Sequence, residues 1–356
     1  MRRGALLVGT TAALVLSIGA IPALACGALV SPNGTIHVVR TTTLAAYHNG
    51  VEHYMTGFEF RGGGAKFGSI VPLPAIPARI IRGGNWSLQR LELEVQPPQK
   101  EVFAAADSGG ASLPRAVVVQ QKNIDSLHIT VLTGGGFAVG KWATDHGFLL
   151  PPDAPTVLDF YARRSPVFMA VQFNAKKAAA RHETTGDAIP IDLVIPTNRP
   201  WVPLRILGLG AKPSLLITAD VFLLTDDRPN MLPVPDGLRA PGSRAAGLRL
   251  VKSEPASAQL LSDLRSDKRM GWVPQGHVWL SFLSLNARAG DLTYDLALNV
   301  RGGAPSPVDA GLSSREVLAA PSGGLGAFWA LSVGILLLVV FVSAALRGRR
   351  GTRIAL

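Results

Sequence analysis

The sequence predicts an α+β fold, predominantly antiparallel β, with sandwich-like sheets, a few short helices and one C-terminal transmembrane helix. Strand-like runs of alternating apolar and polar residues flank the pair Asn49-Gly50, the strongest short signal of a β-hairpin. Short segments with helical spacing of apolar residues lie between further strand-like runs. An uncharged apolar run occupies 324–346. The mixture of short strands and short helices is typical of an antiparallel α+β body.

The C-terminal apolar run predicts a membrane span. Its twenty-three residues contain no charge. As a helix the run would be ~34 Å long, enough to cross a hydrocarbon core of ~30 Å. Four arginines follow it in a tail at 347–356, and by the positive-inside rule they place that tail in the cytoplasm. They are Arg347, Arg349, Arg350 and Arg353.

The N-terminus predicts a secretory signal peptide at 1–25. Two arginines precede an apolar run that ends in the small-residue pattern Ala23-Leu24-Ala25. Retention of this run as a second span is the alternative. Cleavage would leave Cys26 as the first residue, where it is a candidate for lipidation, although Ala23 stands where a lipobox has leucine. Because Cys26 is the single cysteine, no intramolecular disulfide can form.

Between the signal and the span we expect an extracytoplasmic β-rich body at 26–301, followed by a flexible Pro/Ser/Gly/Ala-rich stalk at 302–323. One domain, or two subdomains dividing near residue 150, would fit this length. The formal net charge of +11 includes two arginines of the signal and four of the tail. The body therefore carries 29 basic and 24 acidic residues, which argues against nucleic-acid binding.

The first hairpin sets a predicted register. A two-residue turn at Asn49-Gly50 pairs His48 with Val51 and Ala46 with His53. One face is then apolar and the other more polar, so we expect a sheet with one buried side. The prolines in 67–77 favour an extended edge over a central strand.

Further elements follow along the body. Helices are predicted at 85–96, 137–145, 156–164 and 257–269. Strands are predicted at 115–121, 126–132, 167–175 and 214–225. The segment 226–258, with its prolines and basic residues, is interpreted as a mobile loop, with a functional loop as the alternative. A second hairpin is predicted from strands at 277–287 and 291–300.

The sequence predicts no catalytic, cofactor or metal site. His48 and His53 are the candidate metal ligands, because they share the more polar face of the hairpin, but Glu52 points to the opposite face and a third ligand is missing. Asp145-His146 is an acid–base pair at a predicted helix end, where His146 suits a capping role. Ser69, Ser126 and Ser165 are potential nucleophiles, without the Gly-x-Ser-x-Gly pattern of a nucleophile elbow.

Six short motifs resemble, in their order, an exported bacterial family known only as domain of unknown function 2330. They are Ala25-Cys26-Gly27, Phe58-Glu59-Phe60, the Gly68-Ser69-Ile70-Val71-Pro72-Leu73-Pro74 run, the Trp86-Ser87-Leu88-Gln89-Arg90-Leu91 helix, Pro203-Leu204-Arg205-Ile206 and Asp291-Leu292-Thr293-Tyr294-Asp295-Leu296. The likeness runs over about 25–300. It implies an exported, often C-terminally anchored β-rich body, and offers no reaction or catalytic residues to carry over.

We therefore expect a single-pass cell-membrane protein with an extracytoplasmic body and a cytoplasmic C-terminus. Its role would be binding at the bacterial cell envelope, without a cofactor, and its partner an envelope protein or an anionic cell-wall polymer. The alternative is a membrane-tethered envelope hydrolase. That alternative needs His146, or His48 with His53, in one cleft with an aspartate or serine.

Overall fold

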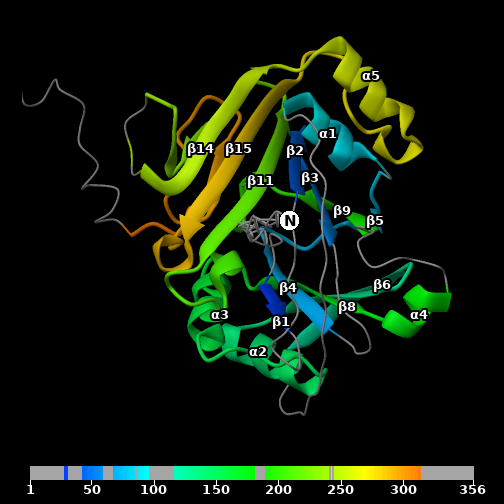
Figure 1. Cartoon of the computed structure of the whole chain (residues 1–356), viewed down its shortest axis with the longest axis vertical. Helices are drawn as coiled ribbons and strands as arrows, with labels where there is room; N and C mark the ends of the chain where they lie inside the picture. Colours follow the sequence, from blue (N-terminus) through cyan, green and yellow to red (C-terminus); the bar gives the residue numbers. More distant parts are fainter. Residues whose placement is uncertain are drawn as a thin grey trace, which may run out of the picture.

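The computed structural model describes residues 28–30, 42–58, 67–84, 86–95, 116–180, 189–239, 242 and 244–313. Two large sheets pack face to face, and helices cover the outer side of each (Figure 1). The chain is α+β with mostly antiparallel sheets, which confirms that part of the predicted fold class.

The larger sheet has eight strands. Its order is β13 (Val234–Asp236), β14 (Arg244–Pro255), β15 (Trp279–Arg288), β11 (Leu216–Thr225), β2 (Thr42–His48), β3 (Val51–Phe58), β9 (Ile189–Pro196) and β5 (Arg79–Arg82). All neighbours are antiparallel except β11 with β2 and β13 with β14. The centre of this sheet therefore joins the N-terminal hairpin to a strand far along the chain.

Two smaller sheets complete the β structure. The five-stranded sheet is antiparallel, in the order β1 (Ala28–Val30), β4 (Phe67–Leu73), β8 (Val167–Phe173), β7 (Leu127–Thr133) and β6 (Val117–Ile124). The three-stranded sheet has the order β10 (Trp201–Val202), β16 (Leu296–Asn299) and β12 (Asn230–Leu232).

Apart from the short helix at 175–180, which follows β8, the described α-helices lie on the outer faces of the two large sheets. The α-helices are α1 (Ser87–Val95), α2 (Gly136–Asp145), α3 (Ala154–Ala162), α4 (Ala175–Ala180) and α5 (Ala258–Ser266). Single 3₁₀ turns are η1 (Arg205–Gly208), η2 (Lys268–Met270) and η3 (Ala289–Asp291). The predicted helices at 85–96, 137–145, 156–164 and 257–269 match α1, α2, α3 and α5 within a few residues. Ser257 caps α5 by accepting a hydrogen bond from the Leu260 backbone N–H.

Three apolar layers hold these elements together. The two large sheets share one core, to which Tyr54 and Val131 contribute. A second core lies between the eight-stranded sheet and helices α1 and α5, around Phe222 and Phe282. A third lies between the five-stranded sheet and helices α2 and α3. The order of layers is helices, five-stranded sheet, eight-stranded sheet, helices.

The N-terminal hairpin forms as predicted, with His48 opposite Val51 and Ala46 opposite His53. The expectation that only one side is buried is wrong. Ala45 and Tyr54 face the core between the sheets, while Ala46 and Met55 face α1 and α5. Because the hairpin lies in the middle of the eight-stranded sheet, a second layer covers each of its faces.

The proline-rich segment and the predicted loop at 226–258 are both more ordered than expected. β4 contains Pro72 yet lies between β1 and β8, which corrects the predicted edge. β1 pairs only with Gly68–Ile70, so Pro72 lies where β4 has one described neighbour. The segment 226–258 contains β12, β13 and the twelve-residue β14. Pairing with β15 stabilises β14, a tertiary contact that local composition does not report.

The predicted second hairpin is also wrong. β15 pairs with β11 and β14, whereas β16 joins the separate sheet with β10 and β12. Among the described residues, no helix has the length and apolar character of a membrane span. The predicted signal, Cys26, the span at 324–346 and the arginine tail lie outside the described residues.

Candidate functional site

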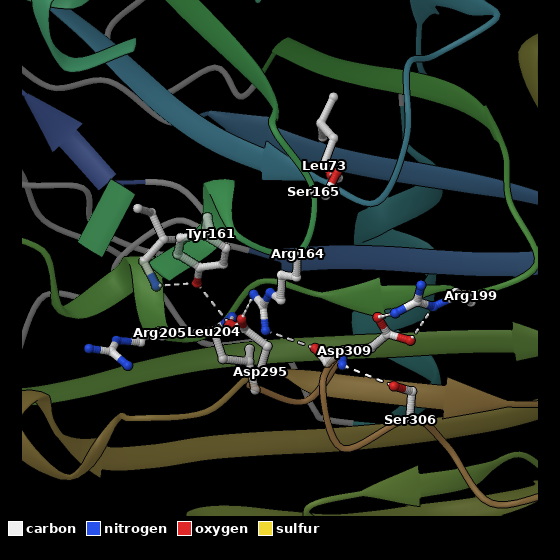
Figure 2. A network of polar contacts seen from close by, with 11 residues as sticks. Leu73, Tyr161, Arg164, Ser165, Arg199, Leu204, Arg205, Asp295, Ser306 and Asp309 are labelled. Carbon is white, nitrogen blue, oxygen red and sulfur yellow. Dashed lines mark hydrogen bonds and ion pairs between the residues drawn. The ribbon is translucent and has the colours of Figure 1, made fainter. Parts of the chain in front are cut away.

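Asp295 is the centre of a buried polar network between α3, η1 and the C-terminal segment (Figure 2). Its side chain has no exposed surface. Oδ1 accepts hydrogen bonds from the Tyr161 hydroxyl at 2.8 Å, the Leu204 N–H at 2.6 Å and the Arg205 N–H at 2.9 Å. Oδ2 forms an ion pair with Arg164. Both carboxylate oxygens are therefore satisfied, as a buried charge requires.

Tyr161 links α3 to the start of η1. Its hydroxyl donates to Asp295 and accepts a hydrogen bond from the Ile206 N–H at 2.9 Å. Burial raises the pKa of Tyr161 well above its usual value, and the neighbouring Asp295 carboxylate raises this pKa further. Tyr161 thus stays protonated and keeps donating to Asp295.

Arg164 is almost completely buried, with 5% of its side chain exposed. Its guanidinium lies 4.6 Å from the ring centroid of Phe160, 4.7 Å from that of Tyr161 and 4.5 Å from that of Trp201. Nη1 donates to the Asp309 backbone carbonyl at 2.9 Å. The aromatic faces and the Asp295 carboxylate together compensate for the cost of burying this cation.

Asp309 fixes the C-terminal segment at 304–313 to the body. Its carboxylate receives two hydrogen bonds from Arg199, one of them from Nε at 2.8 Å. These bonds raise the pKa of Arg199. Ala310 is fully buried, and its carbonyl accepts a hydrogen bond from the Asp295 N–H at 3.0 Å. We call Arg164, Arg199, Asp295 and Asp309 the C-terminal clamp. The described part of the predicted stalk, 302–313, is consequently packed onto the body.

His53 and His48 have separate partners. The Nδ1 of His53 lies 3.0 Å from a carboxylate oxygen of the buried Asp192, and its ring stacks on Trp272 with the centroids 3.8 Å apart. His48 pairs with Asp226 at the end of the sheet, where both side chains are about 40% exposed. The described residues contain no group of three or more His, Cys, Asp or Glu side chains that could hold a metal ion.

The His53–Asp192 pair gives a first testable expectation. In a His53→Phe variant the ring can still stack on Trp272, but the buried Asp192 loses its described side-chain partner. We expect the free energy of unfolding to fall by about 2–3 kcal/mol, measured by urea denaturation. The double variant His53→Phe/Asp192→Leu should recover part of this loss, because no carboxylate then remains buried. A double variant as unstable as the sum of both single variants would contradict the pairing.

The remaining residues that the sequence suggested for catalysis do not come together in one site either. His146 ends α2, stacks on Trp142 at 3.9 Å and has Nδ1 2.7 Å from the Trp142 carbonyl oxygen, in the predicted capping position. Asp145 pairs with Lys141. The Ser165 hydroxyl donates to the Leu73 carbonyl at 2.6 Å. The hydroxyls of Ser69 and Ser126 are buried without a hydrogen-bond partner, so none of these serines is bonded to a histidine.

Glu52 has a carboxyl group that is buried between the two large sheets. It faces the core between the two sheets, opposite Tyr47 on β2 and Ile195 on β9. Both carboxylate oxygens are buried without a hydrogen-bond partner. Burial raises the pKa of Glu52 from 4.5 to about 8. At neutral pH this side chain is therefore mostly a neutral acid.

Sequence reasoning missed the clamp, although a signal for it was present. Two of the motifs that carry the family resemblance, Pro203-Leu204-Arg205-Ile206 and Asp291-Leu292-Thr293-Tyr294-Asp295-Leu296, meet in the network. The first supplies backbone N–H groups and the second supplies the carboxylate. Their separation along the chain concealed the contact.

Comparisons with known proteins give a family and a weak structural likeness. Two crystal structures of baculovirus P35, one of a mutated form after caspase cleavage, align with TM-scores of 0.36 and 0.35 at 9% identity. These alignments cover 76% and 73% of this chain and 99% of each P35 chain, and scores this low support no functional argument. No curated protein matches the sequence. The model of an uncharacterized protein conserved in bacteria matches residues 21–231. Since this match covers more than half of the 356 residues, the chain belongs to the bacterial family of domain of unknown function 2330.

Proposed function

We propose that this protein is a single-pass protein of the bacterial cell membrane whose extracytoplasmic body binds another component of the cell envelope. The C-terminal clamp is the observation that carries this proposal. It fixes the last described segment, 304–313, to the body through Arg199–Asp309 and Arg164–Asp295. The predicted span begins at 324, shortly after that segment.

The clamp limits how far the body can stand from the predicted span. Residues 314–323 can extend by at most about 35 Å. A body held this close to the bilayer can meet only partners in the adjacent layer of the envelope. A fixed attachment also suits a protein that holds a partner at the membrane. We therefore place the binding role next to the outer surface of the cytoplasmic membrane.

The environment of His53 supports a binding role over the hydrolase alternative. His53 is 8% exposed, and Asp192 has no exposed surface. The stack on Trp272 occupies the ring of His53, and a substrate would have to displace it. A general base must reach the proton that it removes, so a buried and stacked pair is suited to a structural role.

The location can be tested with single cysteines introduced into the full-length chain. In a Cys26→Ser background, Lys122→Cys marks an exposed position on β6 and Ala355→Cys marks the tail. We expect a membrane-impermeant maleimide to label Lys122→Cys on intact spheroplasts. It should label Ala355→Cys only after the membrane is opened. The reverse pattern, or labelling of neither position before opening, would overturn the orientation.

Binding is tested separately, by sedimenting the full-length protein in detergent with isolated cell walls. We expect the protein to enter the pellet with the walls and to remain in solution without them. Protein that stays in solution at low salt would contradict a wall component as the partner.

A further inference from the structure

The last described segment of the chain, 304–313, forms a compact turn on the surface of the body. Hydrogen bonds within the segment shape this turn, and they run from the Ala310 N–H to the Ser306 carbonyl, from the Gly311 N–H to the Val308 carbonyl and from the Leu312 N–H to the Pro307 carbonyl. We call 304–313 the strap. The residues at 301–304 are all exposed, and two of them are glycines. The strap therefore has internal structure of its own and a solvent-accessible hinge.

Apolar burial contributes little to holding the strap in place. Pro305 and Ala310 are buried, Leu312 is partly buried, and Val308 is 57% exposed. A segment with few buried apolar contacts opens at a lower free energy than the core of a protein. We therefore expect the strap to open locally before the body unfolds.

Polar contacts attach the strap to the body around Asp309, which Figure 2 shows between Arg164 and Arg199. Arg164 donates to the Asp309 backbone carbonyl at 2.9 Å, and Arg199 donates to the Asp309 carboxylate. One residue further along, the Ala310 carbonyl accepts a hydrogen bond from the Asp295 N–H at 3.0 Å. The attachment is thus concentrated at two neighbouring residues of the strap.

The body keeps its buried charges paired when the strap leaves. Asp295 retains the ion pair with Arg164 and the hydrogen bonds from the Tyr161 hydroxyl and from the Leu204 and Arg205 N–H groups. Arg164 also retains its contacts with aromatic rings. Breaking a buried ion pair is costly because it leaves one charge without a partner. Release of the strap does not carry that cost.

The Arg199–Asp309 pair is the accessible part of the attachment. The side chain of Arg199 is 53% exposed, whereas that of Arg164 is 5% exposed. Dissolved salt screens exposed charges much more than buried ones. The strength of the outer pair therefore depends on the solution around the protein, while the Arg164–Asp295 pair is insulated from it.

We propose that the strap is a releasable part of the tether, which detaches from a body that stays folded, and that the Arg199–Asp309 pair controls this step. With the strap attached, residues 314–323 allow a reach of about 35 Å. The ten residues of the released strap add about as much again, so the reach rises to about 70 Å. The inference rests on the proposed function, because the gain in reach requires the predicted span at 324–346.

Hydrogen exchange of the full-length protein in detergent, followed by mass spectrometry with fragmentation to single residues, tests the release. The Asp295 N–H is the reporter, since it belongs to the body and its acceptor belongs to the strap. We expect it to exchange at the rate of the strap amides and faster than the Leu298 N–H, whose acceptor is the Pro200 carbonyl. Exchange of the Asp295 and Leu298 amides at one common rate would mean that the strap leaves only when the body unfolds, and would overturn the inference.

Two glycine variants separate loss of packing from backbone strain. Gly311 and Gly302 both have a positive φ, of 68° and 82°. A Cβ at Gly311 would overlap the ring of Phe160, whereas a Cβ at Gly302 meets nothing within 4 Å. We expect the strap amides and the Asp295 N–H to exchange about 10-fold or more faster in Gly311→Ala than in Gly302→Ala. Equal rates in the two variants would contradict a strap that is held against the body.

Two arginine variants test the control by the outer pair. Arg199→Ala should speed exchange of the strap amides by about 3- to 5-fold, and added salt should speed it in the wild type more than in this variant. Arg163→Ala, which breaks the exposed pair with Asp159, should change it by less than about 2-fold. Equal effects of the two variants would remove the Arg199–Asp309 pair from control of the release.

The gain in reach is measured with the protein in lipid nanodiscs. A dye on Lys122→Cys, in the Cys26→Ser background, transfers energy to acceptor dyes in the lipid. Transfer should be weaker in Gly311→Ala than in Gly302→Ala, and equal transfer would reject the longer reach. The exchange results are obtained in detergent, so they decide the release of the strap even if the labelling of spheroplasts rejects the proposed function.

Discussion

Replacing Asp295 with alanine is expected to lower the free energy of unfolding by about 3–5 kcal/mol. The substitution would leave the buried Arg164 guanidinium without its carboxylate and would remove the acceptor of the Leu204 and Arg205 N–H groups. It also removes the acceptor of the Tyr161 hydroxyl. Urea denaturation of the full-length chain, followed by tryptophan fluorescence, measures the loss.

The matched control is Asp159→Ala, which removes the exposed ion pair with Arg163 on the same helix. Exposed pairs contribute little, so this change should cost less than about 1 kcal/mol. The double variant Arg164→Leu/Asp295→Leu should be more stable than Asp295→Ala, because no unpaired charge stays buried. Similar losses for Asp295→Ala and Asp159→Ala would contradict the clamp.

The stability of the body is expected to fall as the pH rises from about 4.5 to about 8, because Glu52 is held as a neutral acid. The pKa of Glu52 is raised from 4.5 to about 8 by burial. Over that window the folded state binds a proton that the unfolded state has released, so the pH derivative of stability is negative. The contribution of Glu52 titration to the free energy of unfolding is fully present below pH 4.5 and is lost by pH 8. Its total size is on the order of 5 kcal/mol.

A Glu52→Gln variant separates this contribution from every other titration. It cannot ionise, so its stability relative to the wild type should rise with pH and be higher at pH 8. Glu254→Gln, at an exposed position on β14, should leave the pH profile unchanged. Tyr47 faces Glu52 across the strand pair, but burial raises its pKa from 10, above this pH window. Parallel profiles for wild type and Glu52→Gln would refute a neutral Glu52.

The local sequence pattern was sufficient to predict those elements whose structure depends on residues nearby in the chain. The Asn49-Gly50 turn fixed the hairpin register, including the opposite orientations of His53 and Glu52. Leu260, Leu261 and Leu264, at helical spacing, were sufficient to predict the helix at 257–269, which corresponds to α5. In each of these cases the residues that determine the structure lie within a few positions of one another.

Elements that depend on distant partners were missed. β14 is held by β15, and β16 pairs with β10 and β12 instead of folding back on β15. The burial of both hairpin faces results from layers contributed by residues far along the chain. The clamp joins Arg164, which follows α3, to Asp295, more than one hundred positions away. Periodicity in a single sequence contains no information about such contacts.

The parallel pairing of β2 with β11 determines when the eight-stranded sheet can close. β2 ends at His48, whereas β11 and β15 end at Thr225 and Arg288. The hairpin ends at Phe58 and its parallel partner β11 ends at Thr225, so at about 5–20 residues per second roughly 8–35 s separate their synthesis. Until β9 and β11 have been made, neither strand of the hairpin has its second neighbour in the sheet. Completion of the sheet therefore depends on pairings between distant segments, which form slowly because a long loop must close first.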